Sequence, residues 1–351
     1  MSTTTTTSQV DLLIVGGGPA GLSAALMFSR LRRPTIVYDS GLYRNVQSPT
    51  AHTILGHEPI SPEAYRRKAR SEIEQGYEWT QFVDGKITKL VKSDKGFEAE
   101  DAEGNKVLAK KVILATGVRD VLPAIPGLQE AWGHRAIHCI FCHGTETRDQ
   151  PFGFLLTGAN AKFNPMIMAS GFKLWNTLTH PKTFFFTHGM HTTTPEGLRD
   201  SGLEKFMGII KAHPDKYEIV NDEITSVEQS ASTLTLSFAS RAPLSIPYIL
   251  VFPERILPSP HAESILTKDL LLADLTPFGG SIAAPDPALP AAGMPRMGDD
   301  PRTQVPGLFW AGNSGSPMAN VNLSVAQGQQ AAAFAGESLG EEDLQAMLAS
   351  V

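Results

Sequence analysis

Two cysteines, Cys139 and Cys142, are the only thiols in the chain, and their C-x-x-C spacing can close a small disulfide ring. In such a pair one sulfur attacks an incoming group while the other resolves the mixed disulfide. His143 follows the second cysteine directly, and an ordinary histidine pKa of about 6.5 suits a general base on a thiol. We therefore predict that Cys139, Cys142 and His143 are catalytic. A histidine that only hydrogen-bonds the backbone or a cofactor is the alternative for His143.

Zinc binding is a competing interpretation of the same segment, because cysteine and histidine are the usual zinc ligands and His138 adds a fourth candidate. Four ligands within six residues have difficulty surrounding one ion from a single turn. The sequence offers no second C-x-x-C pair to complete a site. We therefore expect no metal. A buried structural disulfide is the other alternative, and the intracellular setting expected below disfavours it.

A second group of residues has the pattern of a dinucleotide-binding turn. Residues 10–15 form an apolar strand run, Gly16-Gly17-Gly18-Pro19-Ala20-Gly21 follows, and residues 22–31 have helical apolar spacing. The next strand run ends at Asp39, 18 residues past Gly21, where an acid that binds a ribose is expected. Gly16 permits the tight turn, Gly18 lets the backbone approach a pyrophosphate, and Gly21 allows the helix to pack on the strand. The helix N-terminus then faces the phosphate charge.

The remaining sequence predicts further strands and helices that must position these groups. After a helix at 62–75, a small β-meander is indicated by short alternating runs at 80–83, 86–92, 96–100 and 106–109, and a buried strand follows at 111–115. A second α/β unit is predicted from strands at 151–156, 183–187 and 217–220, helices at 165–178 and 195–211, and alternating stretches at 223–229 and 232–238. Residues 252–304 are rich in Pro, Gly and Ala and predict mainly connections, before a strand at 308–311 and a helix at 320–339.

Composition excludes several classes of protein. The 351 residues are 42% hydrophobic and 19% charged, which is typical of an ordinary globular protein of about two domains. The net charge of −6 provides no basic excess for a nucleic acid. No apolar run approaches the roughly 20 residues that span a membrane, and the Thr-rich N-terminus lacks the features of a secretory signal. We expect a cytoplasmic protein with neither nucleic acid nor membrane as partner.

Several motifs together resemble the low-molecular-weight thioredoxin reductase family of flavoproteins, over residues 10–340. They are the turn at 16–21, Asp39-Ser40-Gly41 with Arg44-Asn45, Ala115-Thr116-Gly117, Pro123 to Gly127, the C-x-x-C pair, and the segment 306–312. The resemblance implies an α/β fold with two Rossmann-like, three-layer nucleotide-binding domains and a small β-meander. It also implies a discontinuous FAD-binding domain at 1–118 and 246–351, an inserted NADPH-type domain at 119–245, and a homodimer.

The resemblance also implies roles for individual residues. Cys142 would lie against the flavin and Cys139 would exchange with substrate. His52 and His57 occupy positions beside the flavin and the substrate pocket, although solvated surface histidines are an equal alternative. Asn313 stands where the family has an Asp that binds FAD. The residues expected to bind FAD are Gly16, Gly18, Pro19, Ala20, Gly21, Asp39, Ser40, Arg44, Asn45, His52, Ala115, Thr116, Gly117, Gly312 and Asn313.

Two departures from thioredoxin reductases proper favour another branch of the family. The segment 138–144 is most similar to dithiol oxidases such as those of gliotoxin and holomycin, because His143 replaces the usual Asp. The second nucleotide turn is also damaged: from Gly158, the next two glycine positions are Asn160 and Phe163, whose bulk would block a pyrophosphate. The segment 187–191 has no arginine for the ribose phosphate of NADPH. The inserted domain is therefore predicted to have lost its nicotinamide cofactor.

The resulting hypothesis is an FAD-dependent dithiol oxidase. It would close an intramolecular disulfide in a small-molecule secondary metabolite, such as an epidithiodiketopiperazine precursor, while O2 is reduced to H2O2. Without NADPH the two domains have no reason to rotate, so we expect a fixed arrangement with the cysteines at the flavin. One alternative is an NADPH-dependent thioredoxin-disulfide reductase. A flavin-binding regulatory or scaffold protein without turnover is another.

Overall fold

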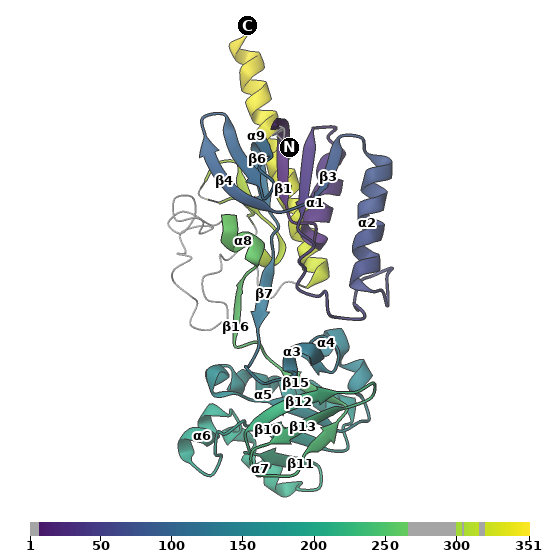
Figure 1. Cartoon of the computed structure of the whole chain (residues 1–351), viewed down its shortest axis with the longest axis vertical. Helices are drawn as coiled ribbons and strands as arrows, with labels where there is room; N and C mark the ends of the chain where they lie inside the picture. Colours follow the sequence, from purple (N-terminus) through teal and green to yellow (C-terminus); the bar gives the residue numbers. More distant parts are fainter. Residues whose placement is uncertain (1–6, 266–299, 304, 316–319) are drawn as a thin grey trace.

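A computed structural model describes residues 7–265, 300–303, 305–315 and 320–351. Figure 1 shows two α/β bodies stacked along the long axis of the molecule and joined by two strands, β7 (Val118–Val121) and β16 (Arg255–Pro258). These two strands pair antiparallel with each other. The chain therefore leaves the first body and returns to it through one two-stranded connection.

The first body is built on a seven-stranded sheet in the order β3-β2-β1-β6-β5-β4, with β17 paired to β6. Five of its strands are parallel, whereas β4 and β5 form an antiparallel hairpin that pairs with β6. Central strands covered on both faces need continuous apolar runs, and residues 12–15 are fully buried. The strands are β1 (Thr7–Val15), β2 (Thr35–Asp39), β3 (Thr80–Asp84), β4 (Ile87–Ser93), β5 (Gly96–Asp101), β6 (Lys106–Leu114) and β17 (Leu308–Trp310).

Helices cover this sheet and hold the first turn in place. α1 (Pro19–Ser29) packs along α9 (Val321–Ala349), and α2 (Pro62–Gly76) lies beside α1. Small residues allow the close approach: a methyl group on Gly328 would lie 2.1 Å from the carbonyl oxygen of Ala20. α8 (Pro260–Ile265) contacts β4.

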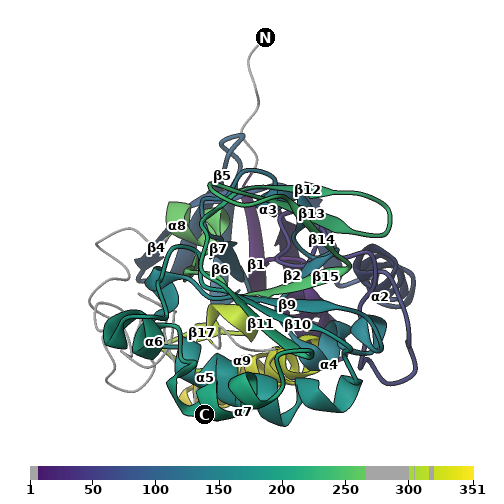
Figure 2. The ribbon, with the colours of Figure 1, turned by 90° about the horizontal axis from the view of Figure 1, so that it is seen from below.

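The second body contains two sheets. A parallel sheet has the order β11-β10-β9-β15-β8, and a three-stranded antiparallel sheet has the order β12-β13-β14. Figure 2 shows the three-stranded sheet on one side of the parallel sheet and the helices on the other. One apolar core combines buried residues of the two sheets, and a second combines residues of the parallel sheet and the helices. The strands are β8 (Ala136–Ile137), β9 (Phe152–Leu155), β10 (Thr183–Phe186), β11 (Tyr217–Val220), β12 (Ile224–Gln229), β13 (Leu234–Phe238), β14 (Leu244–Ile246) and β15 (Tyr248–Val251). The helices are α3 (Leu128–Ala131), α4 (Ile140–His143), α5 (Asn164–Lys173), α6 (Pro195–Asp200) and α7 (Met207–Ala212).

The predicted α/β architecture is confirmed, with differences in individual elements. The run at 80–83 does not belong to a meander, because β3 pairs parallel with β2 at the edge of the sheet. The runs at 106–109 and 111–115 are largely one strand, β6. The predicted helix at 195–211 is divided between α6 and α7, because Gly202 has a left-handed φ of +73° and breaks the helix between them. The C-terminal helix continues ten residues past 339.

The sheet pairings bear on where the two domains meet. β15 lies beyond the expected boundary at 245/246, yet it pairs with β9 and β8 in the parallel sheet of the second body. We propose to extend the inserted domain to residue 251. The division into 1–118 and 246–351 around an insertion is otherwise kept as a proposal.

In the described ranges no helix combines the length and apolar character that a membrane span requires. Most of the predicted connection at 252–304, from 266 to 299, lies outside the described residues.

Candidate functional site

One cavity is lined by both bodies. The first body contributes the turn at 16–20, the segment at 39–53 and residues 115–117, which follow β6. The second body contributes Cys142 and His143 of α4, with Trp132 and His138 beside them. The cavity thus joins the predicted dinucleotide site to the predicted redox pair.

The N-terminus of α1 opens onto this cavity and suits a phosphate group. Gly18 is the N-cap residue in an extended conformation, and a methyl group built on it would meet nothing within 4 Å. A methyl group on Gly16 would instead lie 2.2 Å from the carbonyl oxygen of Ala115, and Gly16 has a φ of +119°. Gly16 therefore closes the turn, while Gly18 leaves its backbone open to a ligand. Exposed N–H groups at a helix N-terminus attract phosphate, so the residues fit the pyrophosphate of FAD.

Asp39, the residue that the sequence predicts to bind a ribose, lines the cavity. Its side chain is buried, and it accepts hydrogen bonds from the hydroxyl of Tyr43 and, at 3.0 Å, from the backbone N–H of Gly41. A methyl group on Gly17 would lie 2.0 Å from Oδ2 of Asp39. The absence of a side chain at Gly17 therefore lets the carboxylate stand directly against the turn.

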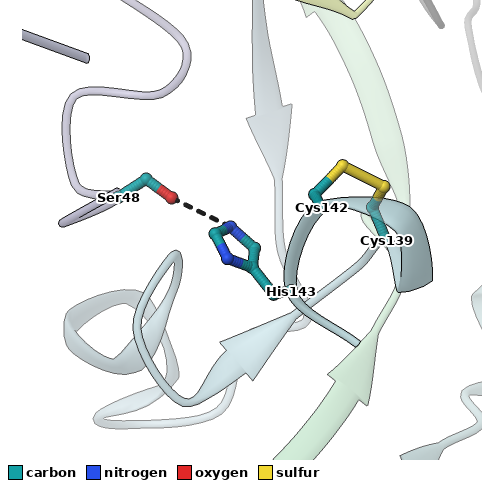
Figure 3. Close-up of a disulfide and its surroundings, with 4 residues drawn as sticks. All are labelled: Ser48, Cys139, Cys142 and His143. Atoms are coloured by element: carbon teal, nitrogen blue, oxygen red, sulfur yellow. Dashed lines mark hydrogen bonds between the residues drawn. A yellow bond between two sulfur atoms is a disulfide. The ribbon is translucent and has the colours of Figure 1, made fainter. Parts of the chain in front are cut away.

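The two cysteines form a disulfide at α4, with Cys139 as the N-cap residue of the helix (Figure 3). Cys142 lines the cavity and Cys139 does not. Because both sulfur atoms are bonded to each other, neither is available as a zinc ligand in this state. The arrangement places one sulfur toward the cavity and leaves the other on its outer side.

His143 points from α4 toward the first body, where its Nε2 lies 3.2 Å from the hydroxyl of Ser48 (Figure 3). Ser48 also donates a 3.3 Å hydrogen bond to the carbonyl of Gly133. A hydroxyl has only one proton, so Nε2 of His143 is the donor toward Ser48 and Nδ1 keeps the lone pair. Burial lowers the pKa of His143, although nearby Glu146 acts in the opposite direction. The neutral ring can accept a proton.

His138 has a different environment. Its ring stacks on Trp132 with centroids 5.1 Å apart. Burial, reinforced by the charge of Arg44, lowers the pKa of His138 to about 4. It is a neutral part of the cavity wall at physiological pH.

His52 lines the cavity, as expected, and is held by carboxylates. Nδ1 lies 2.5 Å from Glu58, and Nε2 lies 3.1 Å from the hydroxyl of Thr50 and 3.2 Å from Glu146. The resemblance implies a position beside the flavin and the substrate pocket for His57 as well. Its ring packs edge-on against Tyr65, and it is not among the residues that line the cavity.

The structure brings most of the predicted site residues to this cavity, although it does not test their roles. Gly21, Gly312 and Cys139 are the members of the set that do not line it. Gly21 instead packs on the turn, and a methyl group there would lie 1.8 Å from the carbonyl oxygen of Gly16. The residues that line it are Gly16, Gly18, Pro19, Ala20, Asp39, Ser40, Arg44, Asn45, His52, Ala115, Thr116, Gly117, Cys142, His143 and Asn313.

Sequence reasoning missed several residues near the site. Ser48, Asp120 and His261 line the cavity, and Glu146 contacts it through His52. None of them belongs to a motif with fixed spacing. Only the exposed carboxylates near the histidines could have suggested an interaction, and their distances along the chain gave no reason to pair them.

The bridging loop, defined as residues 44–48, bonds the first body to the second. Arg44 forms two hydrogen bonds with the carboxylate of Asp120, at 2.8 and 2.7 Å. Gln47 donates at 3.1 Å to the carbonyl of Gln129 and accepts at 3.0 Å from its side chain. Together with Ser48, these contacts hold the cysteine helix beside the cavity.

The region that corresponds to a second nucleotide turn is filled by its own side chains. Asn160 is buried and donates at 3.1 Å to the carbonyl of Phe252. Asn164 is fully buried and donates to the carbonyls of Thr157 and Asp200, at 3.0 and 2.7 Å. Phe163 packs against the apolar core.

Known proteins resemble this chain in sequence and in fold. Thioredoxin reductase tcpT of Claviceps purpurea is 43% identical over 161 residues, which cover 45% of this chain and 50% of that protein. The chain thus spans about half the length of this curated relative. The crystal structure of an oxidoreductase from Agrobacterium tumefaciens matches with a TM-score of 0.74 and 25% identity, over 94% of this chain and 98% of that one. HlmI matches in fold with a TM-score of 0.75 and 24% identity, over 97% and 96% of the two chains.

The family profile described as pyridine nucleotide-disulphide oxidoreductase matches residues 10–159. This segment contains the glycine turn, the bridging loop, both cysteines and His143. The cavity geometry and the fold agree with the FAD site expected from the sequence. Residues 10–159 of this chain are therefore similar to the pyridine nucleotide-disulphide oxidoreductase family, and the cavity that they line has residues that fit FAD.

Proposed function

We propose that this protein is an FAD-dependent dithiol oxidase that closes an intramolecular disulfide in a small molecule, with O2 as the final acceptor and H2O2 as its product. One observation supports the proposal most directly. The Cys139–Cys142 disulfide lies at the cavity that fits FAD, next to a histidine whose pKa is lowered by burial. A disulfide, a base and a two-electron acceptor are what dithiol oxidation requires.

The residues support an exchange in two steps. A substrate thiolate attacks the sulfur of Cys139, on the outer side of the pair, and the Cys139–Cys142 bond breaks. The second substrate thiolate then attacks the mixed disulfide, which releases the oxidised substrate and leaves both cysteines reduced. Nδ1 of His143 accepts a proton from a thiol during these steps. When bound, FAD supplies the acceptor for the two electrons of the cysteine pair and passes them to O2.

The filled second turn favours O2 over NADPH as redox partner. The side-chain amides of Asn160 and Asn164 donate hydrogen bonds to backbone carbonyls, so these side chains fill the space that a pyrophosphate would need at the turn. At 187–191, Thr187 donates at 2.6 Å to the carbonyl of Met190, and Nδ1 of His188 accepts from the N–H of Ile224 at 3.2 Å. These polar groups form hydrogen bonds within the second body, and the segment has no arginine or lysine to bind a ribose phosphate.

The bridging loop supports a fixed arrangement of the two bodies. A reductase that alternates between NADPH and a protein disulfide must rotate its inserted domain, whereas the contacts of Arg44, Gln47 and Ser48 retain the cysteine helix at the cavity. A protein that serves one small dithiol needs no such rotation. We also propose an epidithiodiketopiperazine-like substrate, a homodimer and a cytoplasmic location, as the sequence resemblance implies.

Thioredoxin-disulfide reductase activity is the second candidate, since the matched relative tcpT has that name. Anaerobic absorbance of the flavin distinguishes the two functions. We expect a small dithiol to bleach the flavin, NADPH to leave it oxidised, and air to restore the colour with formation of peroxide. Rapid bleaching by NADPH would instead support the reductase. A flavin that neither reagent reduces would contradict both functions.

A further inference from the structure

We propose that His52, His143 and Glu146 form a binding site for a divalent transition metal of the zinc class, bridging the two bodies at the edge of the cavity. One potential ligand atom from each residue lies within 4.8 Å of the others; the two histidines are half-buried, and the side chain of Glu146 is 38% exposed. Two imidazoles and a carboxylate are ligands that zinc accepts in proteins. This site is distinct from the zinc site considered for the cysteines, because it uses no sulfur.

The spacing of these atoms suits a metal with little rearrangement. Tetrahedral zinc with bonds of about 2.0–2.1 Å separates its ligand atoms by roughly 3.3 Å. Nε2 of His52 and Oε1 of Glu146 are 3.2 Å apart. The rings of His52 and His143 meet edge-on with centroids 5.8 Å apart. Since all three ligand atoms lie within 4.8 Å of one another, His143 would have to move by no more than about 1.5 Å to reach this spacing.

Both histidines are already oriented by a partner on the other ring nitrogen. Glu58 contacts Nδ1 of His52, and Glu58 also accepts from the backbone N–H of Thr53. A carboxylate on the far nitrogen is the usual support of a metal-binding histidine, since it directs the second nitrogen's lone pair outward. Ser48 has the same effect on His143, because it occupies Nε2 and leaves Nδ1 free.

The ligands come from both bodies of the protein. His52 belongs to the segment before α2, whereas His143 and Glu146 lie at α4 and just after it. A bound ion would therefore join the bodies beside the bridging loop. The ion would also bind the lone pair of His143, which could then no longer accept a proton. If His143 is the base of the proposed dithiol oxidase, zinc would therefore inhibit that reaction. The binding site itself does not depend on that function.

Calorimetric titration of ZnCl2 into the oxidised, FAD-loaded protein tests the site, because the closed disulfide leaves no thiolate to bind zinc. We expect one equivalent to bind, and Glu146→Gln and Glu58→Gln each to weaken binding about 10- to 100-fold. Glu130→Gln, which changes an exposed carboxylate on α3, is the matched control and should bind as the wild type does.

X-ray absorption at the zinc edge gives a second measurement, and we expect nitrogen and oxygen neighbours without sulfur. The proposal is overturned if no stoichiometric zinc binds, if sulfur is found, or if Glu146→Gln and Glu130→Gln bind zinc equally. Because the titration contains no dithiol and requires no turnover, zinc binding can fail while the oxidase is upheld, and the reverse also holds. Flavin absorbance of each variant shows that it is folded and loaded.

Discussion

The hydroxyl of Ser48 contacts Nε2 of His143 at 3.2 Å, and this contact connects the bridging loop to the helix of the cysteine pair. Since Ser48 donates its own proton to the carbonyl of Gly133, the ring must donate from Nε2. The tautomer with a free Nδ1 is thereby selected. A residue of the first body thus determines which nitrogen of a second-body residue is available as a base.

Replacing Ser48 by alanine removes this orientation. We expect Ser48→Ala to slow anaerobic flavin reduction by a dithiol about fivefold, because one hydrogen bond contributes about 1 kcal/mol. Ser48→Thr retains the hydroxyl and should restore most of the rate. Ser71→Ala, on the exposed face of α2, is the control. Equal rates for Ser48→Ala and wild type would show that the contact does not orient the base.

Variants of the cysteine pair and of the base should have different effects on flavin reduction. We expect Cys142→Ser to abolish flavin reduction by a dithiol, because no disulfide can then form, while His143→Ala slows it and leaves the flavin bound. Stopped-flow absorbance under anaerobic conditions measures both. Full activity in the two variants would contradict the proposed exchange.

Much of the fold could be predicted because local patterns identify strands buried on both faces. The glycine turn at 16–21 follows an apolar run and precedes a helical pattern, and Asp39 ends the next apolar run, which together are typical of a strand, turn and helix that bind a dinucleotide. The place of β3 could not be predicted. The alternating run of four residues at 80–83 fits a meander as well as a sheet edge, and only the pairing with β2 decides between them.

The site was predictable where spacing determines chemistry and not where contacts form between distant segments. The cavity contains both His143 and His52, which the sequence identified. Ser48 contacts His143 across 95 residues of sequence, and Asp120 contacts Arg44 across 76 residues. The periodicity of the sequence gives no information about contacts between such distant segments. Asn160 likewise fills its turn through a hydrogen bond to Phe252, which is 92 residues away along the chain.

The ion pair of Arg44 with Asp120 should stabilise the junction of the two bodies. The Asp120 side chain is only 5% exposed, so removing its partner leaves a buried charge. We expect Arg44→Met to lower the free energy of unfolding by about 3–5 kcal/mol. Arg67→Met, which removes an exposed pair with Glu63, should cost less than about 1 kcal/mol. Urea unfolding followed by flavin fluorescence measures both, and equal losses would show that the Arg44 pair is not a buried contact.

His261 should make the stability of the protein depend on pH. The ring is fully buried, and its Nε2 accepts a 3.0 Å hydrogen bond from the N–H of Ile87. Burial, with the charge of Lys86, lowers its pKa to about 4, while Asp39 acts in the opposite direction. Below about pH 6.5 the unfolded chain binds a proton that the folded chain excludes, so stability falls as the pH decreases from about 6.5 to 4 and is unaffected above that range.

The variant His261→Gln retains a hydrogen-bond acceptor but cannot titrate. Between pH 7 and pH 5 the wild type should therefore lose about 2 kcal/mol more stability than His261→Gln. His213→Gln, which replaces an exposed histidine, should follow the wild type. Urea unfolding at the two pH values measures the difference. If His261→Gln and wild type lose the same stability, the ring is protonated in the folded protein and its hydrogen bond to Ile87 does not hold it neutral.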